Sequence, residues 1–303
     1  MAEKTIMIIG DVMLDKFSYG RVNRLNPESP APLIKIEREE YKLWGAANVA
    51  ANIVSLGKRA VLVGRIGADE HGQIFQNLCR EQGIDFEWIS YSGNPTITKV
   101  RIIETTYHQQ LVRMDHENIV AVQNAQILEI LSIISHSPPD LIVISDYDKG
   151  LITQDFAKLL IATWISVIAD AKPGRLGWFH GALIVKPNFK EFSEHLGIKW
   201  ENTDIFIEAH GKWLAQLLET NLVITRSEHG ASIIERWWEI QHIPTEAQDI
   251  FDVTGAGDTF IAAMAIALAE WETIADAARF GNRASGVVVG KVGTATVTRE
   301  ELL

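Results

Sequence analysis

Short apolar runs alternate along this chain with segments of helical spacing, and this alternation limits the fold more than any other feature. The apolar runs are rich in Ile and Val and have the length of strands: they cover residues 5–9, 60–66, 140–144, 166–169, 182–185 and 221–225. Helical spacing covers residues 46–56, 70–82, 120–135, 153–163 and 203–219. This repeated β-α order predicts an α/β fold with a mostly parallel central sheet and helices on both faces.

Two segments interrupt the alternation. Residues 17–43 and 96–114 are polar and β-branched with partial alternation, which indicates exposed strands. We expect them to pair in a small β-sheet lid, formed by about residues 16–43 and 95–114, over the site of a single domain spanning residues 1–303. Because a free lid would expose strand edges and apolar surface, we also expect a homodimer through the lid.

The composition narrows the classes of partner. The chain has 39 Asp and Glu against 28 Lys and Arg, which argues against a general binder of nucleic acid or anionic membranes. Its single cysteine, Cys79, excludes an intramolecular disulfide and fits a buried helix position. The longest apolar run, residues 260–269, is about half of what a membrane-spanning helix needs. We therefore expect a cytoplasmic protein.

A glycine-rich turn precedes that apolar run. Residues 251–259 read FDVTGAGDT, and backbone N–H groups at Gly255, Ala256 and Gly257 can point at one anion beside the positive end of the following helix. Asp258, in the first helical turn, can accept a hydroxyl proton. This combination indicates phosphoryl transfer to an alcohol, although a plain glycine turn with an acidic helix start has the same pattern.

Two motifs resemble the signatures of the ribokinase (PfkB) family of carbohydrate kinases. Residues 252–259 (DVTGAGDT) are similar to its C-terminal signature, and residues 45–50 (GAANVA), followed by Gly57 and Gly67, are similar to its N-terminal one. Within the family the chain most resembles the heptose-phosphate kinases, on motifs at residues 10–15, 94–99, 109–115, 145–150 and 287–294. The resemblance spans nearly the whole chain and implies a ribokinase-like fold.

The resemblance also implies a reaction. An enzyme of this kind uses ATP and Mg²⁺ to phosphorylate D-glycero-β-D-manno-heptose 7-phosphate at O1, giving the 1,7-bisphosphate, with Asp258 as base and the amides of Gly255, Ala256 and Gly257 around the developing charge. The main alternative is another sugar or sugar phosphate, and a non-catalytic sugar-binding relative is a further one. A nicotinamide dehydrogenase is unsupported because no strand is followed by G-x-G-x-x-G, and the chain has no Walker A loop.

Substrate-binding residues are expected near the first strand and the lid. Asp11 and Asp15 follow the first strand, where open α/β folds place ligands, and Asn48 offers both a donor and an acceptor to sugar hydroxyls. Gly45 belongs to the N-terminal signature. For the substrate phosphate, Arg113 and Lys149 are favoured over Lys99 and Arg101. Each has an ordinary alternative: lid solubility for Asp15, packing for Asn48, and solvated charge for the cations.

One departure from the family stands beside these residues. Trp44 occupies the place where these kinases usually carry the first glycine of a Gly-Gly pair, so its indole either lines the sugar pocket or packs in a lid interface.

The nucleotide side is expected to include Asn188 and Glu191, which resemble the family's Asn-x-x-Glu element and organise Mg²⁺ through water. Their spacing also suits a capping box. The remaining expected nucleotide-binding residues are Thr225, Ser227, Gly230 and Asn282. Asp252 and Thr254 are implied to bind a monovalent cation such as K⁺.

Overall fold

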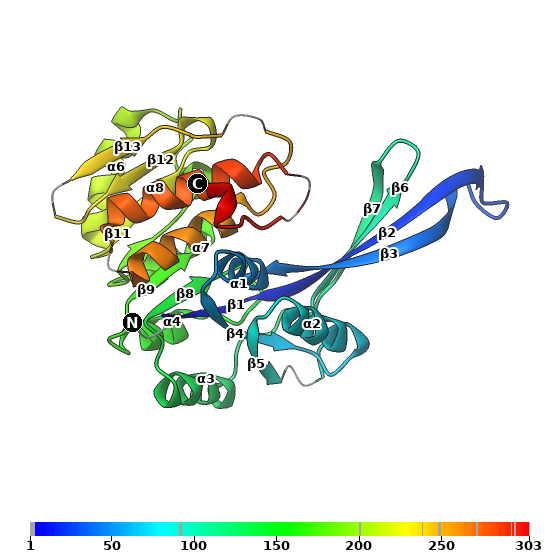
Figure 1. Ribbon diagram of the computed structural model, residues 1–303, viewed down its shortest axis with the longest axis horizontal. Helices are drawn as coiled ribbons and strands as arrows, with labels where there is room; N and C mark the ends of the chain where they lie inside the picture. The colour runs from blue at the N-terminus through cyan, green and yellow to red at the C-terminus, as the bar shows by residue number, and fades with distance from the viewer. Residues whose placement is uncertain are drawn as a thin grey trace.

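The computed structural model of the protein describes residues 4–90, 93–199, 201–237, 239–247, 250–270, 272–291, 293 and 295–302. In this part of the chain, thirteen strands form two sheets (Figure 1). The main sheet runs, from edge to edge, β13 (Ile240–Ile243), β12 (Ala231–Ile234), β11 (Asn221–Thr225), β10 (Ile184–Val185), β9 (Val167–Asp170), β8 (Leu141–Ser145), β1 (Thr5–Gly10), β4 (Arg59–Ile66) and β5 (Asp85–Ser90).

The main sheet is parallel from β5 to β11, and β12 is antiparallel to both of its neighbours, β11 and β13. Successive side chains of a strand point to opposite faces. Accordingly, Ile6 and Ile8 of β1 join one buried core cluster, whereas Met7 and Ile9 join the other. Both faces of the sheet are therefore covered, as the unbroken apolar runs predicted.

Helices supply both covers. One core contains side chains of α1 (Ala46–Ser55), α2 (Glu70–Glu81), α7 (Ala256–Ala269) and α8 (Ile274–Val288). The other contains side chains of α3 (Asn124–His136), α4 (Gln154–Ile161), α5 (Phe189–His195), α6 (Asp204–Leu217) and the 3₁₀ turn η1 (Pro173–Phe179). Two further 3₁₀ turns are η2 (Ser227–His229) and η3 (Glu300–Leu302).

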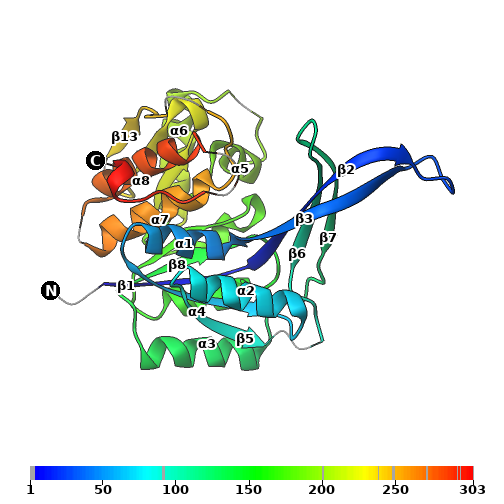
Figure 2. The same cartoon turned by 45° about the vertical axis from the view of Figure 1, so that its right-hand side comes forward.

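The second sheet projects from the main body as a long arm (Figures 1 and 2). Its strand order is β3 (Pro32–Gly45), β2 (Val12–Leu25), β6 (Thr98–Glu104) and β7 (Gln109–His116). The two interrupting segments of the sequence do pair, through the parallel contact of β2 with β6. Their strands span residues 12–45 and 98–116, so the first begins nearer to β1 than expected.

Several element bounds differ from those expected. The helix expected at residues 120–135 begins at Asn124, because the N–H of Val122 donates to the carbonyl of Gly150 and Gln123 caps the helix. The strand expected at residues 182–185 contains only Ile184 and Val185. Cys79 is buried in α2, as expected, and burial raises the pKa of its thiol to about 12. Among the described residues, no helix combines the length and the apolar character needed to span a bilayer.

Candidate active site

The predicted glycine-rich turn leads directly into α7. Gly255 precedes the helix with φ 80°, a left-handed conformation that glycine adopts without the cost a side chain would impose. Gly255, Ala256 and Gly257 border a cavity of about 430 Å³. The positive end of the helix dipole lies at the same border, so the cavity suits an anion such as phosphate.

Asp258 lies at this border with its carboxylate buried. The side-chain amide of Asn48 donates to its Oδ2 at 2.8 Å, and the hydroxyl of Tyr147 donates to its Oδ1 at 2.6 Å. Burial raises the pKa of Asp258 to about 6, because it penalises the charged form more than these two donors stabilise it. The carboxylate is thus ionised at neutral pH and suited to accept a proton.

A buried lysine lies beside the glycine turn and lines the same cavity. Lys186, which is 2% exposed, has its Nζ 2.9 Å from Oδ2 of Asp170, and a Cβ built on Gly257 would lie 3.7 Å from this Nζ. Burial alone would lower the pKa of Lys186, but the charges of Asp170 and Glu191 raise it above its ordinary value. A protonated ammonium therefore lies beside the predicted phosphate position. No role was expected for Lys186 from the sequence, although a lysine at the end of an apolar strand was a usable signal.

All six expected nucleotide-binding residues line the cavity: Asn188, Glu191, Thr225, Ser227, Gly230 and Asn282. Asn188 and Glu191 also form the capping box of α5, with bonds of 2.8 Å and 2.9 Å between each side chain and the other's N–H. The apolar side chains of Ile250, Val253 and Phe260 border the same space. Polar groups and an apolar wall in one cavity suit a nucleotide.

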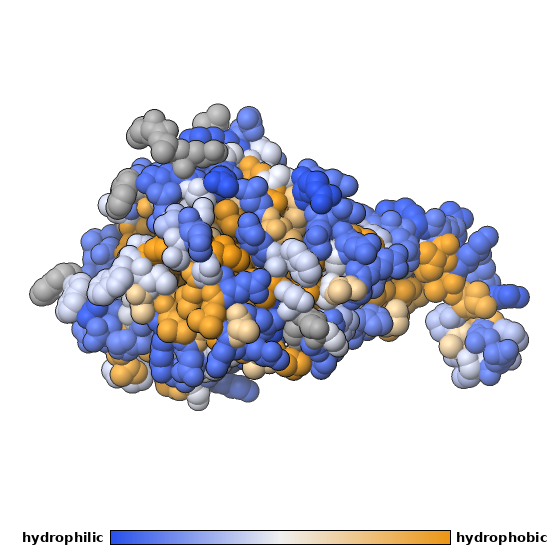
Figure 3. All heavy atoms as spheres, turned by 90° about the horizontal axis from the view of Figure 1, so that it is seen from below, coloured by the Kyte–Doolittle hydropathy of each residue, from blue (hydrophilic) through white to orange (hydrophobic). Residues whose placement is uncertain are grey.

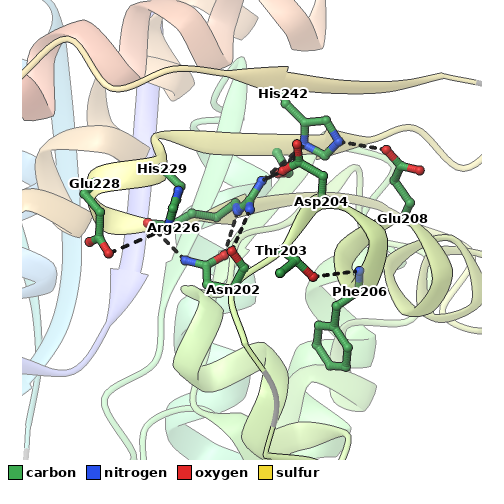
Figure 4. A network of polar contacts seen from close by, with 10 residues as sticks. Asn202, Thr203, Asp204, Phe206, Glu208, Arg226, Glu228, His229 and His242 are labelled. Carbon is green, nitrogen blue, oxygen red and sulfur yellow. Dashed lines mark hydrogen bonds and ion pairs between the residues drawn. The ribbon is translucent and has the colours of Figure 1, made fainter.

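Arg226 holds the turn that carries Ser227 and Gly230 (Figure 4). Its guanidinium, 2% exposed, donates to Asp204, to the side chain and carbonyl of Asn202, and to Ser232. These bonds connect the end of β11 to the start of α6 and to β12. Ser227 has φ 53°, a strained value for a residue with a side chain, so this turn depends on its surroundings for its shape.

Asp11 is buried and serves the loop after β8. Its two oxygens accept the N–H groups of Tyr147, Lys149 and Leu151 at 3.0, 2.9 and 3.2 Å. Burial raises the pKa of Asp11, and these three donors oppose the rise. The aspartate expected to bind sugar hydroxyls thus fixes a backbone segment next to the base.

Asp15, Gly45 and Asn48 lie where the second sheet meets the main body. Asp15 is 1% exposed and receives a 2.7 Å bond from Arg101. Gly45 has φ 69°, and a Cβ there would lie 2.4 Å from the carbonyl oxygen of Asp11, so only glycine fits. Asn48 lies in the first turn of α1, and from there its side chain donates to Asp258.

Of the cations considered for the substrate phosphate, Arg113 lies on β7, the edge strand of the second sheet, Lys99 lies on β6, and Lys149 lies in the loop after β8. Arg113 is half exposed and bonds both oxygens of Asp115. Lys149 lies 2.7 Å from Oε2 of Glu117, and Lys99 lies 3.1 Å from Asp115. None of the six described residues expected to bind the sugar substrate (Asp11, Asp15, Gly45, Asn48, Arg113 and Lys149) lines the 430 Å³ cavity.

Two of the residues expected to bind cations, Asp252 and Glu191, offer single carboxylates. Asp252 accepts the N–H groups of Thr254 and Gly293 at 2.9 and 3.0 Å; burial raises its pKa, but these bonds lower it below the ordinary value. In the described residues, no three His, Cys, Asp or Glu side chains group as a metal site. Mg²⁺ commonly binds through one or two carboxylates, waters and substrate phosphates, so the Glu191 carboxylate at the cavity fits it.

The chain matches the sequence profile of the pfkB family carbohydrate kinases over residues 4–301. The bifunctional protein HldE of Shewanella sp. (strain ANA-3) is 37% identical over 300 residues, which cover 98% of this chain and 62% of that protein. The HldE of Shewanella putrefaciens (strain CN-32 / ATCC BAA-453) is 38% identical over 302 residues with the same coverage. The chain therefore spans 62% of the length of these relatives.

Solved structures show the same ribokinase-like α/β fold. Phosphofructokinase-2 from Escherichia coli, in complex with potassium, superposes with a TM-score of 0.82 at 17% identity and covers 100% of this chain and 97% of its own. Ribokinase from Arabidopsis thaliana, complexed with ribose and ATP, gives 0.77 at 19% identity, with 99% and 98% coverage.

Proposed function

Because this chain belongs to the pfkB family of carbohydrate kinases, we propose that it transfers the γ-phosphoryl group of ATP to O1 of D-glycero-β-D-manno-heptose 7-phosphate. That it is a phosphotransferase acting on a sugar hydroxyl follows from the family. The heptose 7-phosphate assignment is supported by the motifs shared with heptose-phosphate kinases and by the identity to HldE proteins. The observation that carries the proposal is the buried Asp258 beside the anion-binding turn.

The chemistry follows from this placement. The O–H bond at the sugar O1 breaks as the new O–P bond forms, Asp258 takes the proton, and ADP leaves with the electrons of the broken P–O bond. Amides of Gly255, Ala256 and Gly257, together with Lys186, stabilise charge on the transferred group. A base of this kind contributes roughly 10²–10⁴ to the rate. Glu191 would hold Mg²⁺ through water, and a bound Mg²⁺ would supply positive charge to the ATP phosphates.

The nucleotide occupies the 430 Å³ cavity, with Asn188, Thr225 and Asn282 among its neighbours. The sugar then binds on the other side of Asp258, between α1 and the second sheet. There Asp15, Lys42, Trp44, Lys99 and Arg101 share one face, since their strand positions are in register and two residues apart. This sheet is the proposed lid, and Arg113 on its edge strand β7 and Lys149 in the loop after β8 are the proposed ligands of the substrate phosphate.

A monovalent cation is part of the proposal. The Escherichia coli phosphofructokinase-2 structure is a complex with potassium. In this chain, Asp252 presents an ionised carboxylate close to Thr254 and to the segment at Gly293, so we assign K⁺ to this position.

The opposite face of the proposed lid is apolar. Ile36, Val112 and Met114 are 40%, 47% and 44% exposed, and apolar side chains are visible along the arm in Figure 3. Monomeric proteins rarely leave such surface uncovered. A second copy of the chain would cover it, so the proposed enzyme is a homodimer through the lid.

The test is a panel of sugars and sugar phosphates assayed for ADP release. We expect D-glycero-β-D-manno-heptose 7-phosphate to give the highest kcat/KM and ³¹P NMR to show a new phosphate at the anomeric position. A higher kcat/KM with another sugar would favour the alternative substrate. If no sugar in the panel gave more ADP release with the wild type than with Asp258→Asn, the result would favour a non-catalytic relative.

A further inference from the structure

The hydroxyl of Tyr147 contacts the carboxylate that the mechanism uses as base. Tyr147 follows β8, and its hydroxyl donates to Oδ1 of Asp258 at 2.6 Å, while Asn48 donates to Oδ2. Each carboxylate oxygen can accept more than one hydrogen bond. The two donors therefore fix the plane of the carboxylate and leave acceptor positions for a substrate hydroxyl.

The backbone of Tyr147 is held on both sides. Asp11 accepts its N–H and those of Lys149 and Leu151, as described above. Asp146, immediately before Tyr147, accepts a hydrogen bond from the guanidinium of Arg175, which also donates to Asp148. Hydrogen bonds to the buried carboxylates of Asp11 and Asp146 thus hold the short segment that contains Tyr147. Its ring points toward α7, where the hydroxyl meets Asp258.

The electrostatic surroundings keep the tyrosine a neutral donor. Burial and the charge of Asp258 raise the pKa of the Tyr147 hydroxyl above its ordinary value. Asp170 and Lys186 act on the Asp258 carboxylate from the main sheet with opposite signs. The ammonium of Lys172 lies 4.9 Å from the centre of the Tyr147 ring, and Lys172 is also paired with Glu191.

We propose that Tyr147 is a positioning residue for the catalytic base: its hydroxyl orients the Asp258 carboxylate and favours its ionised form, and Asp11 acts on the base through Tyr147. This inference rests on the proposed kinase function for its kinetic consequences. Its electrostatic consequence does not need the sugar, because the hydrogen bond exists in the protein alone.

The test compares Tyr147→Phe with the wild type in two measurements. Carboxyl ¹³C NMR of aspartate-labelled protein gives the pKa of Asp258 directly, and the pH profile of kcat/KM gives the pKa of the free enzyme's base. Loss of a hydrogen bond to an ionised group should raise the Asp258 pKa by about 1 pH unit, or tenfold in its dissociation constant. The acidic limb of the profile should move to higher pH by the same amount.

Tyr107→Phe is the matched control, because Tyr107 is 82% exposed in the turn between β6 and β7. Asp11→Asn should shift the Asp258 pKa in the same direction, and should add little in the Tyr147→Phe background. An unchanged Asp258 pKa in folded Tyr147→Phe would overturn the proposal. If the pKa shifts caused by Asp11→Asn and Tyr147→Phe were additive in the double variant, Asp11 would not act on Asp258 through Tyr147, and that part of the proposal would fail. If the sugar assignment were wrong, wild-type turnover would fail while the NMR titration still decided the role of Tyr147.

Discussion

The side chain of Asn48 donates a 2.8 Å hydrogen bond to Oδ2 of Asp258, 210 residues further along the chain. This bond joins the first turn of α1, which follows β3 of the second sheet, to the first turn of α7, which borders the 430 Å³ cavity. The proposed base therefore lies where the proposed sugar site and the proposed nucleotide site meet.

Replacing the base should remove chemistry and leave nucleotide binding. Asp258→Asn should lower kcat by roughly 10²–10⁴, because the amide keeps the shape but cannot accept the proton. The dissociation constant for ATP, measured by calorimetry, should change little. Asp155→Asn, on an exposed carboxylate of α4, is the control. Near-normal turnover in the variant would refute Asp258 as the base.

The same substitution should change how stability depends on pH. Burial raises the pKa of Asp258 to about 6 in the folded protein, above 3.8, so its contribution to the free energy of unfolding is full below pH 3.8 and is lost as the pH rises through 6. The Asp258→Asn variant has no carboxyl group at this position, so its free energy of unfolding does not undergo this decrease. Between pH 4 and pH 8 the variant should gain about 2–3 kcal/mol relative to the wild type in urea unfolding. A difference that stays constant across this range would contradict the raised pKa.

Arg113 tests the proposed phosphate position. Arg113→Ala should raise KM for heptose 7-phosphate by tenfold or more while ATP affinity stays the same, since a charged hydrogen bond is worth about 1.5–3 kcal/mol. Asp115, its present partner, is a useful comparison: Asp115→Asn frees the guanidinium and should not raise KM. Equal activity of the wild type on the unphosphorylated heptose would indicate a different substrate.

Trp44 should affect the choice of sugar. It is partly buried, pairs with Met13 across the second sheet and lies on the face that carries Asp15 and Lys42. Trp44→Gly should change the ranking of kcat/KM among sugar phosphates and widen the accepted set, with ATP affinity unaffected. The same ranking in wild type and variant would place the indole outside the sugar site.

Replacing Arg226 should weaken the binding of ATP and leave the binding of the sugar nearly unchanged. Arg226→Met removes the bonds that hold the turn at Ser227 and Gly230, so KM for ATP should rise by about tenfold while KM for the sugar changes little. Arg226→Lys should recover part of the loss. Arg59→Met, on an exposed arginine of β4, serves as control. An equal rise in both KM values would instead indicate general damage to the fold.

Much of the fold could be predicted because it is encoded locally. Buried strands such as β1 and β8 show as short runs of Ile and Val, and helix starts carry side-chain caps, as Asp69 does for α2. For β12 and β13 the sequence indicated only a hairpin around residues 237 and 238 and did not predict the bounds of the two strands, since short strands at an edge depend on the neighbour they pair with. The glycine-rich turn could be predicted because its left-handed backbone at Gly255 requires glycine, which is visible in the sequence.

The missed site residues have a common cause. Tyr147, Lys186 and Arg226 are single polar residues at strand ends, where a tyrosine, lysine or arginine is ordinarily a surface group. Their roles arise from partners distant in sequence, such as Asp258 for Tyr147, 111 residues away. Asp11 was expected to bind sugar, but its bonds to backbone amides could not be read from a sequence that does not show which loop returns to β1.

The order of strands in the main sheet bears on how the enzyme is made. β1 lies between β4 and β8, and the strands from β9 to β13 then extend one edge in the order of the chain. α7 comes afterwards and returns to pack on α1. On the ribosome, the sheet can thus assemble outward as the polypeptide emerges, whereas the base reaches Asn48 only once α7 has been translated. A nascent chain halted before α7 holds most of the wall of the 430 Å³ cavity and lacks the proposed base, so catalytic competence should follow the completion of the main sheet.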